Sequence, residues 1–136
     1  MSGEPPRVLQ PDGWPRPSGY SDGISVSGRL VVLAGQIGWN PTTGKFESDE
    51  LTAQVRRALE NIVKLLAEAG AEPRHLVRLT WFVTDRDAYM SARREIGAAY
   101  RDVIGAHYPP MSLVFVGALV EARAKVEIEA TAVVPQ

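Results

Sequence analysis

The sequence predicts an α+β sandwich of order β-β-α-β-α-β-β, in which two helices pack on one face of a mixed sheet. Three observations predict this fold. Two segments carry apolar residues at alternating spacings of four and three, which is typical of amphipathic helices. Short runs rich in Val, Ile, Leu and Phe stand before, between and after these segments, as expected of strands. Two of these runs are apolar on both faces, so both faces must be covered.

The N-terminal part of the chain is predicted to form an arm followed by a hairpin. Residues 1–19 should be irregular or extended, because prolines recur throughout them and exclude a regular helix. Residues 24–26 and 30–36 then resemble two strands joined by a turn at Ser27-Gly28. The loop that follows contains Pro41 and Gly44, which both break regular structure.

The middle of the chain alternates helix and strand. A first helix is expected from Thr52 to Gly70, which is placed to end it as a C-cap. Residues 76–83 predict a strand, and residues 87–104 predict a second helix whose stripe includes Arg93. The chain then offers two more strands, 112–120 and 125–134, joined by a polar link at 121–124.

Length and composition describe one globular domain over residues 1–136. The 136 residues are 45% hydrophobic and 23% charged, with a formal net charge of -1. This balance disfavours a dedicated nucleic-acid binder, which usually has a basic face. The chain has no cysteine, which excludes disulfides, thiolate zinc sites and cysteine nucleophiles, and its two histidines lack metal-ligand spacing. No apolar run approaches the ~20 residues of a membrane span, so a cytoplasmic protein is expected.

The two segments that are apolar on both faces predict self-association. Two helices can cover only one face of the sheet, yet residues 30–34 and 113–120 are apolar on both faces. Another copy of the same chain is the economical cover, because contacts at a sheet face close into a symmetric ring. We therefore expect an obligate homo-oligomer.

Two charged residues are candidates for chemistry, and each has a purely structural alternative. Glu127 shares a strand face with Lys125 and Glu129, where a partly buried carboxylate can orient or deprotonate water. A solvated face, or an ion pair with Lys125 of a neighbouring copy, explains the same pattern, and spacing alone favours this reading. Arg93 interrupts an apolar helix stripe, either as a snorkelling side chain or as an anion-binding group.

Several motifs, taken in order, resemble the RidA/YjgF family of reactive-intermediate deaminases, also called the L-PSP endoribonuclease family. They are PSGYS at 17–21, GRLVVLAGQI followed by NPTTG, AQVRRALENIVKLLAEAG, LTWFVTD and VEIEA. The resemblance covers nearly the whole chain. It implies a homotrimer with three clefts between subunits, each binding a small molecule. It also implies hydrolysis of enamines and imines to a carbonyl compound and ammonia without a metal or cofactor.

The resemblance also implies roles for individual residues. Tyr20 matches the cleft tyrosine, and Ala34-Gly35-Gln36 matches a Ser-Gly-Gln segment with alanine in place of serine. Arg93 stands where the family usually has asparagine, and Glu127 matches the glutamate that positions the attacking water. The signature arginine that clamps the substrate carboxylate is replaced by Met111.

Met111 predicts an altered substrate range. A guanidinium holds a carboxylate through two parallel charged hydrogen bonds, and a thioether offers no equivalent. Met111 and Trp39 instead imply a more apolar pocket. The alternative to a deaminase is a ligand-binding or scaffold trimer without turnover. RNA cleavage or translation inhibition is a third, which the near-neutral charge disfavours.

Overall fold

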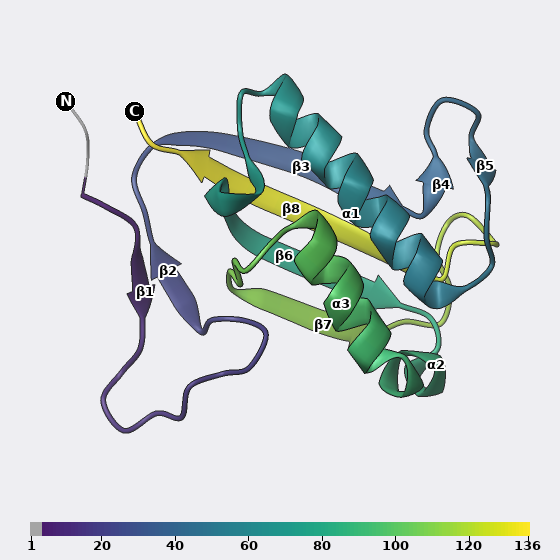
Figure 1. The fold of residues 1–136 in the computed structure, drawn as a ribbon, viewed down its shortest axis with the longest axis horizontal. Coiled ribbons are helices and arrows are strands. Elements are labelled where there is room, and N and C mark those ends of the chain that lie inside the picture. Colours follow the sequence, from purple (N-terminus) through teal and green to yellow (C-terminus); the bar gives the residue numbers. More distant parts are fainter. Residues whose placement is uncertain (1–3) are drawn as a thin grey trace.

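The computed structural model describes residues 4–136, and its main element is a four-stranded mixed sheet of order β3-β8-β6-β7 (Figure 1). Strand β8 lies inside this sheet and runs antiparallel to both of its neighbours, whereas the edge strand β7 runs parallel to β6. The short pairs β1-β2 and β4-β5 lie outside the main sheet. In chain order the elements are β1 (Arg7–Leu9), β2 (Gly23–Ser25), β3 (Arg29–Ile37), β4 (Trp39–Asn40), β5 (Lys45–Phe46), α1 (Leu51–Glu68), the 3-10 turn η1 (Pro73–His75), β6 (Leu76–Val83), α2 (Arg86–Ser91), α3 (Arg93–Val103), β7 (Met111–Phe115) and β8 (Val126–Val134).

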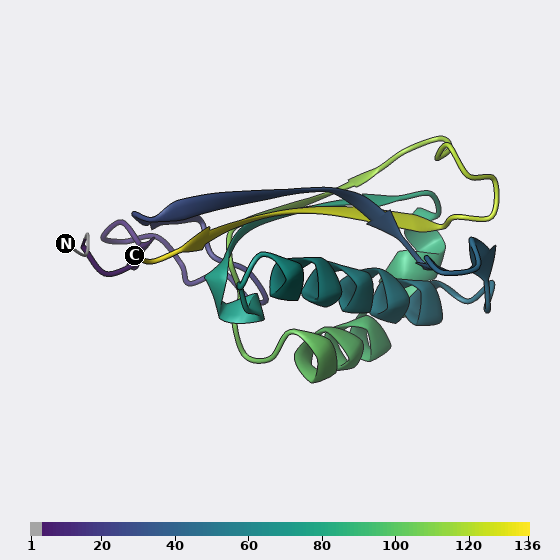
Figure 2. The ribbon, with the colours of Figure 1, turned by 90° about the horizontal axis from the view of Figure 1, so that it is seen from above.

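The molecule has two layers. Figure 2 shows α1 and α3 side by side on one face of the sheet, while the loop between β7 and β8 projects beyond the other face. The predicted α+β class, with a mixed sheet and helices on one face, is confirmed. Among residues 4–136, no helix combines the length and apolar character that a membrane crossing requires.

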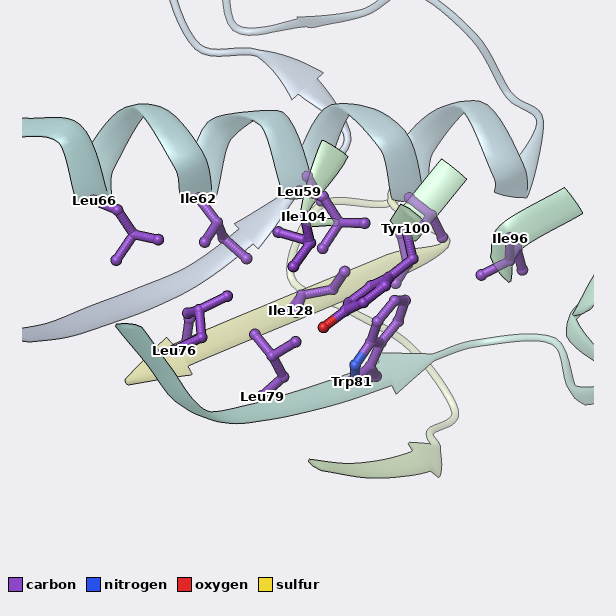
Figure 3. Close-up of a cluster of buried hydrophobic side chains, with 14 of the residues drawn as sticks. Leu59, Ile62, Leu66, Leu76, Leu79, Trp81, Ile96, Tyr100, Ile104 and Ile128 are labelled. Carbon is purple, nitrogen blue, oxygen red and sulfur yellow. The ribbon is translucent and has the colours of Figure 1, made fainter. Parts of the chain in front are cut away.

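The core lies between the helices and the sheet (Figure 3). Helix α1 places Leu59, Ile62 and Leu66 over the sheet, where all three are fully buried. They pack with Leu79 of β6 and Ile128 of β8, which are also fully buried. Each such side chain contributes about 1.5–3 kcal/mol relative to an exposed one. The alternating burial of β8 follows from this packing, because every second side chain faces the helices.

The predicted hairpin between residues 24–26 and 30–36 is wrong. Strand β2 pairs with β1 instead, so the N-terminal arm contains a three-residue strand, and β3 pairs with β8. Gly28 has a φ of 150°, and a Cβ there would lie 2.8 Å from the carbonyl carbon of Val134. This glycine therefore allows the chain to enter the main sheet beside the end of β8 rather than to turn back on β2.

Two other predicted elements differ in their extent. The helix expected at 87–104 is divided at Ala92 into α2 and α3, and its first part begins beside Asp85, whose side chain accepts the Ala88 N–H at 3.0 Å. The strand expected at 112–120 ends at Phe115. Its partner β6 ends at Val83, directly opposite Phe115, so the following residues have no ladder to join.

The sheet face away from the helices carries exposed apolar side chains. Leu30 and Val32 of β3 are 64% and 69% exposed, and Val114 of β7 is 42% exposed. In the adjoining loop, Val120 is 98% exposed. We call this surface, with Glu127, Glu129 and Thr131 of β8, the open face of the sheet.

Candidate functional site

A cleft of about 700 Å³ lies on the helical side of the sheet, at the edge formed by β7. It is bounded by β6, β7, helices α2 and α3, and the end of the N-terminal arm. Three of the residues predicted to bind substrate line this cleft together: Tyr20, Arg93 and Met111. We call it the edge cleft.

Each of these three residues comes from a different element. Met111 is the first residue of β7 and pairs with Leu79, so its side chain lies on the helical face and packs against the core. Arg93 is the first residue of α3, and its side chain is exposed. Tyr20 belongs to the arm and is 43% exposed.

A buried serine attaches the arm beside the edge cleft. The Ser21 hydroxyl donates a hydrogen bond to the Tyr108 carbonyl at 2.7 Å, and the Ser21 N–H donates to the Pro109 carbonyl at 3.4 Å. Ser21 also forms a parallel bridge with Pro110, directly before β7. These contacts hold the adjacent Tyr20 against the cleft although the arm has little regular structure.

The deeper wall of the edge cleft is aromatic and rigidly held. The Tyr100 hydroxyl donates to the His107 carbonyl at 2.6 Å, and the His107 ring lies 2.8 Å from the Leu76 carbonyl oxygen. Burial, together with the neighbouring Tyr108, raises the pKa of Tyr100 well above its usual value. Burial also raises the pKa of Tyr89, an effect that Arg93 partly opposes. These tyrosines are therefore neutral at physiological pH.

The other predicted site residues gather on the open face. Strand β3 has a bulge between Leu33 and Gln36 that contains Ala34 and Gly35. Glu127 of β8 is half-buried and lies against this bulge. A Cβ on Gly35 would lie 2.7 Å from both Cγ and Cδ of Glu127, and closer still to Oε2. The carboxylate therefore occupies the space that only a glycine leaves free.

The structure thus divides the predicted site residues into two groups. Ala34, Gly35 and Glu127 lie together on the open face, because the neighbours of Glu127 in β8 face the helices. Tyr20, Arg93 and Met111 lie in the edge cleft on the opposite side of the sheet. Trp39, expected to make the pocket more apolar, does not line the cleft and instead packs against Phe46 at 6.1 Å between ring centroids.

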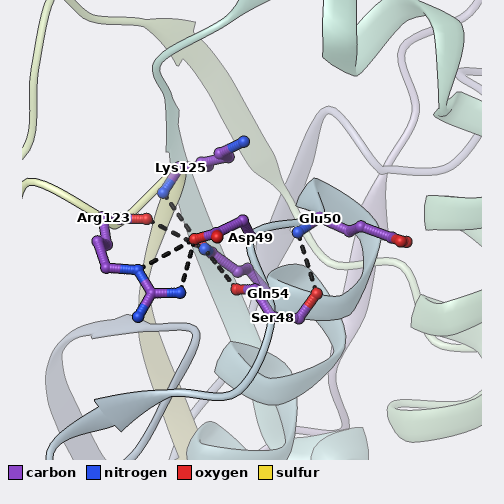
Figure 4. A network of polar contacts seen from close by, with 6 residues as sticks. All are labelled: Ser48, Asp49, Glu50, Gln54, Arg123 and Lys125. Atoms are coloured by element: carbon purple, nitrogen blue, oxygen red, sulfur yellow. Dashed lines mark hydrogen bonds and ion pairs between the residues drawn. The ribbon is translucent and has the colours of Figure 1, made fainter.

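A buried amide fixes the chain just before Glu127 (Figure 4). Gln54 of α1 is 1% exposed, and its side-chain oxygen accepts the Lys125 N–H at 2.8 Å. Its amide nitrogen donates to the Ser48 and Arg123 carbonyls, both at 3.1 Å. Nearby, the Arg123 guanidinium binds Asp49 through two hydrogen bonds. Gln54 therefore fixes where β8 begins.

Within residues 4–136, no group of three or more His, Asp or Glu side chains is arranged to hold a metal ion. Trp81, Tyr100 and Tyr108 also line the cleft, although none of them was predicted to do so. The sequence places Trp81 in a predicted strand and Tyr100 in a predicted helix, without bringing the two together. Their convergence with Tyr108 depends on the pairing of β6 with β7, which no local pattern reveals.

Comparisons with known proteins agree with one another. Residues 15–134 match the family described as Endoribonuclease L-PSP. The chain is 32% identical over 114 residues to the 2-iminobutanoate/2-iminopropanoate deaminase of Escherichia coli K12, covering 84% of this chain and 86% of the relative. It is also similar to YyfB of Yersinia pestis, a Rid-family protein of unknown function (TM-score 0.83, 32% identity, 95% and 98% coverage). Escherichia coli TdcF with bound serine is a further structural neighbour (TM-score 0.67, 30% identity, 94% and 98% coverage).

Proposed function

The chain belongs to the Endoribonuclease L-PSP family, and from this membership we propose that it is an enamine/imine deaminase of the RidA type with an altered substrate range. The observation that carries the proposal is the Glu127 carboxylate packed against the Gly35 backbone. A carboxylate on a partly buried surface can guide and deprotonate a water molecule.

The proposed reaction converts an imine and water into a carbonyl compound and ammonia. Glu127 accepts a proton from water as the water oxygen bonds to the imine carbon; the π pair moves to nitrogen, which takes a proton from solvent, giving a carbinolamine. Protonated Glu127 then returns its proton to this nitrogen. The C–N bond breaks and ammonia leaves as the O–H pair forms the C=O bond, the hydroxyl proton passes to solvent, and Glu127 is again a carboxylate. An enamine enters the same sequence after protonation at carbon.

The two groups of site residues support a site assembled from two copies of the chain. One protomer holds Glu127 and Arg93 on opposite sides of its sheet. A ligand that contacts both therefore needs the open face of one copy and the edge cleft of another. The exposed Leu30 and Val32 supply an apolar surface for such contacts. We propose the homotrimer as this assembly.

The proposed change in substrate range rests on the residues of the edge cleft that are available to bind the substrate carboxylate. Met111 offers no charged donor, whereas Arg93 lines the same cleft and is exposed. We propose that Arg93, or backbone amides around Gly35, bind the substrate anion.

Ammonia release from a panel of imines tests the catalytic role. Glu127→Gln keeps the shape of the side chain but removes the base, so hydrolysis should fall to the background rate. Glu129→Gln is the matched control, because Glu129 lies two residues further on the same face and is exposed. Equal rates for wild type and Glu127→Gln would refute the role of this carboxylate.

Subunit mixing tests the two-copy site. Arg93→Ala and Glu127→Gln are each prepared as inactive homo-oligomers and then exchanged. If each site takes Arg93 from one copy and Glu127 from another, random assortment restores about a quarter of wild-type activity. Activity that stays at the level of the unmixed variants would contradict a shared site.

A ligand-binding trimer without turnover is the second candidate, and Met111 in place of the signature arginine favours it. It is supported if ketoacids bind the wild type while no imine in the panel is hydrolysed faster than background. RNA cleavage remains disfavoured by the net charge of -1.

A further inference from the structure

The edge cleft contains an unusual concentration of aromatic rings. All four tyrosines of the chain line it, together with one of the three tryptophans, Trp81. Trp81 and Tyr100 lie 6.4 Å apart between ring centroids, and Tyr100 and Tyr108 stack at 5.5 Å with an interplanar angle of 19°. The rings therefore form a ladder, which Figure 3 shows in part at Trp81 and Tyr100.

The ladder is preorganised rather than loosely packed. Trp81 and Tyr100 are 4% and 5% exposed, and the Tyr100 hydroxyl is already used in its bond to the His107 carbonyl. Tyr108 is the half-buried, accessible end of the ladder, and its stack on Tyr100 fixes its ring before a ligand binds. Such a wall loses little side-chain entropy when a ligand stacks on it.

One polar atom of this wall has no partner. Within residues 4–136, the indole Nε1 of Trp81 is the buried side-chain nitrogen or oxygen without a hydrogen bond. An indole N–H can only donate, and leaving it unpaired in a buried position is unfavourable. Because this nitrogen is buried, Trp81 supports the wall from behind rather than contacting a ligand itself.

The charge around the cleft is entirely positive. Arg93 and Arg101 are its charged lining residues, and no Asp or Glu side chain lines it. Within the described residues, neither arginine forms an ion pair. An anion entering the cleft therefore meets free guanidinium groups without opposing carboxylates.

We propose that the edge cleft selects aromatic 2-oxo and 2-imino acids, with the ring stacked on Tyr108 at the accessible end of the ladder and the carboxylate bound by Arg93. Met111 contributes a polarisable contact to the ring instead of a second cation. A three-carbon acid has no ring to stack on Tyr108 and would leave this part of the cleft unused. The turnover of such imines rests on the proposed deaminase function, whereas their binding does not.

Binding of stable ketoacids tests this selectivity without requiring catalysis. Isothermal titration calorimetry compares phenylpyruvate with pyruvate on the intact oligomer. Stacking on the ladder should make phenylpyruvate bind about tenfold more tightly or better. Equal affinities for the two acids would overturn the proposal.

Variants separate the contributions of the ring and the charge. Tyr108→Leu removes the half-buried, accessible ring of the ladder and should bring the two affinities together. Arg93→Gln should weaken both acids by a similar factor and preserve their ratio. Trp14→Leu removes an exposed aromatic ring outside the cleft and should change neither affinity. A ratio that survives Tyr108→Leu in a protein with wild-type melting behaviour would refute the stacking.

The two proposals fail in different ways. Selective binding of phenylpyruvate without hydrolysis of any imine would leave the selectivity standing and refute the deaminase. Glu127-dependent hydrolysis combined with equal binding of phenylpyruvate and pyruvate would leave the deaminase standing and refute the aromatic preference.

Discussion

The substitution Gly35→Ala tests whether the position of the Glu127 carboxylate controls activity. Gly35 has no positive φ, so alanine fits its backbone conformation and only the added Cβ matters. That Cβ would lie 2.7 Å from Glu127 Cγ and Cδ, whereas ordinary contact begins at 3.4 Å. Cγ must therefore retreat by about 0.7 Å, which requires the whole side chain to turn. Since a displacement of about 1 Å can cost 10²-fold in rate, we expect kcat/KM to fall roughly 10- to 100-fold.

The fold should tolerate this change, because the opposing atoms belong to a side chain that can rotate on a partly open face. Ammonia release and thermal unfolding are measured on the same preparation. Gly117→Ala is the control, since its Cβ would meet no atom within 4 Å. A folded Gly35→Ala protein with wild-type kcat/KM would refute the reasoning.

Three further changes address stability. Gly38→Ala should destabilise the protein by about 1–3 kcal/mol in denaturant unfolding. The added Cβ would lie 2.5 Å from the backbone Cα of Gln54, which cannot rotate away. An unchanged unfolding midpoint would show that helix α1 can move aside without cost. Gln54→Leu leaves the Lys125 N–H without its acceptor and should lower the unfolding free energy by about 1–3 kcal/mol. Gln54→Glu should be no milder, because its buried carboxylate would face the Ser48 and Arg123 carbonyl oxygens. Burial lowers the pKa of His75 below 6.5, so the unfolded chain binds more protons and stability should fall as the pH drops below 6.5. His75→Asn, which retains an acceptor for the Glu72 N–H, should flatten that pH dependence in urea unfolding, and an unchanged slope would assign it to another group.

Local sequence patterns predicted those helices and strands that bury a single face against the core. Strand β6 coincides with the predicted range 76–83, because its β-branched and aromatic composition agrees with burial that alternates from Leu79 to Val83. Helix α1 begins and ends within two residues of its predicted range, since its buried stripe spans most of its turns. The division at Ala92 was not predictable in this way. The apolar stripe from Tyr89 to Val103 keeps its helical spacing although Ala92 is not helical, so the sequence shows no break at that position.

Local sequence patterns did not predict which strands pair with one another. The dipeptide Ser27-Gly28 is a plausible hairpin turn, yet Gly28 instead leads the chain alongside Val134, more than a hundred positions away. The apolar run after β7 looks like a strand from its composition, but a strand ends where its partner ends. The candidate site shows the same limit. The family resemblance selected Tyr20, Met111 and Glu127, but only the sheet topology shows on which face each lies.

The interior position of β8 has a consequence for synthesis of the protein on the ribosome. Every other element is made before β8, yet neither β3 nor β6 can complete its ladder without it. Translation proceeds at about 5–20 residues per second. Until β8 has been made, the edges of β3 and β6 that pair with it are unpaired in the nascent chain, and such edges are targets for aggregation. Chaperone binding to stalled nascent chains should therefore persist until residues 126–134 have emerged, and then fall sharply.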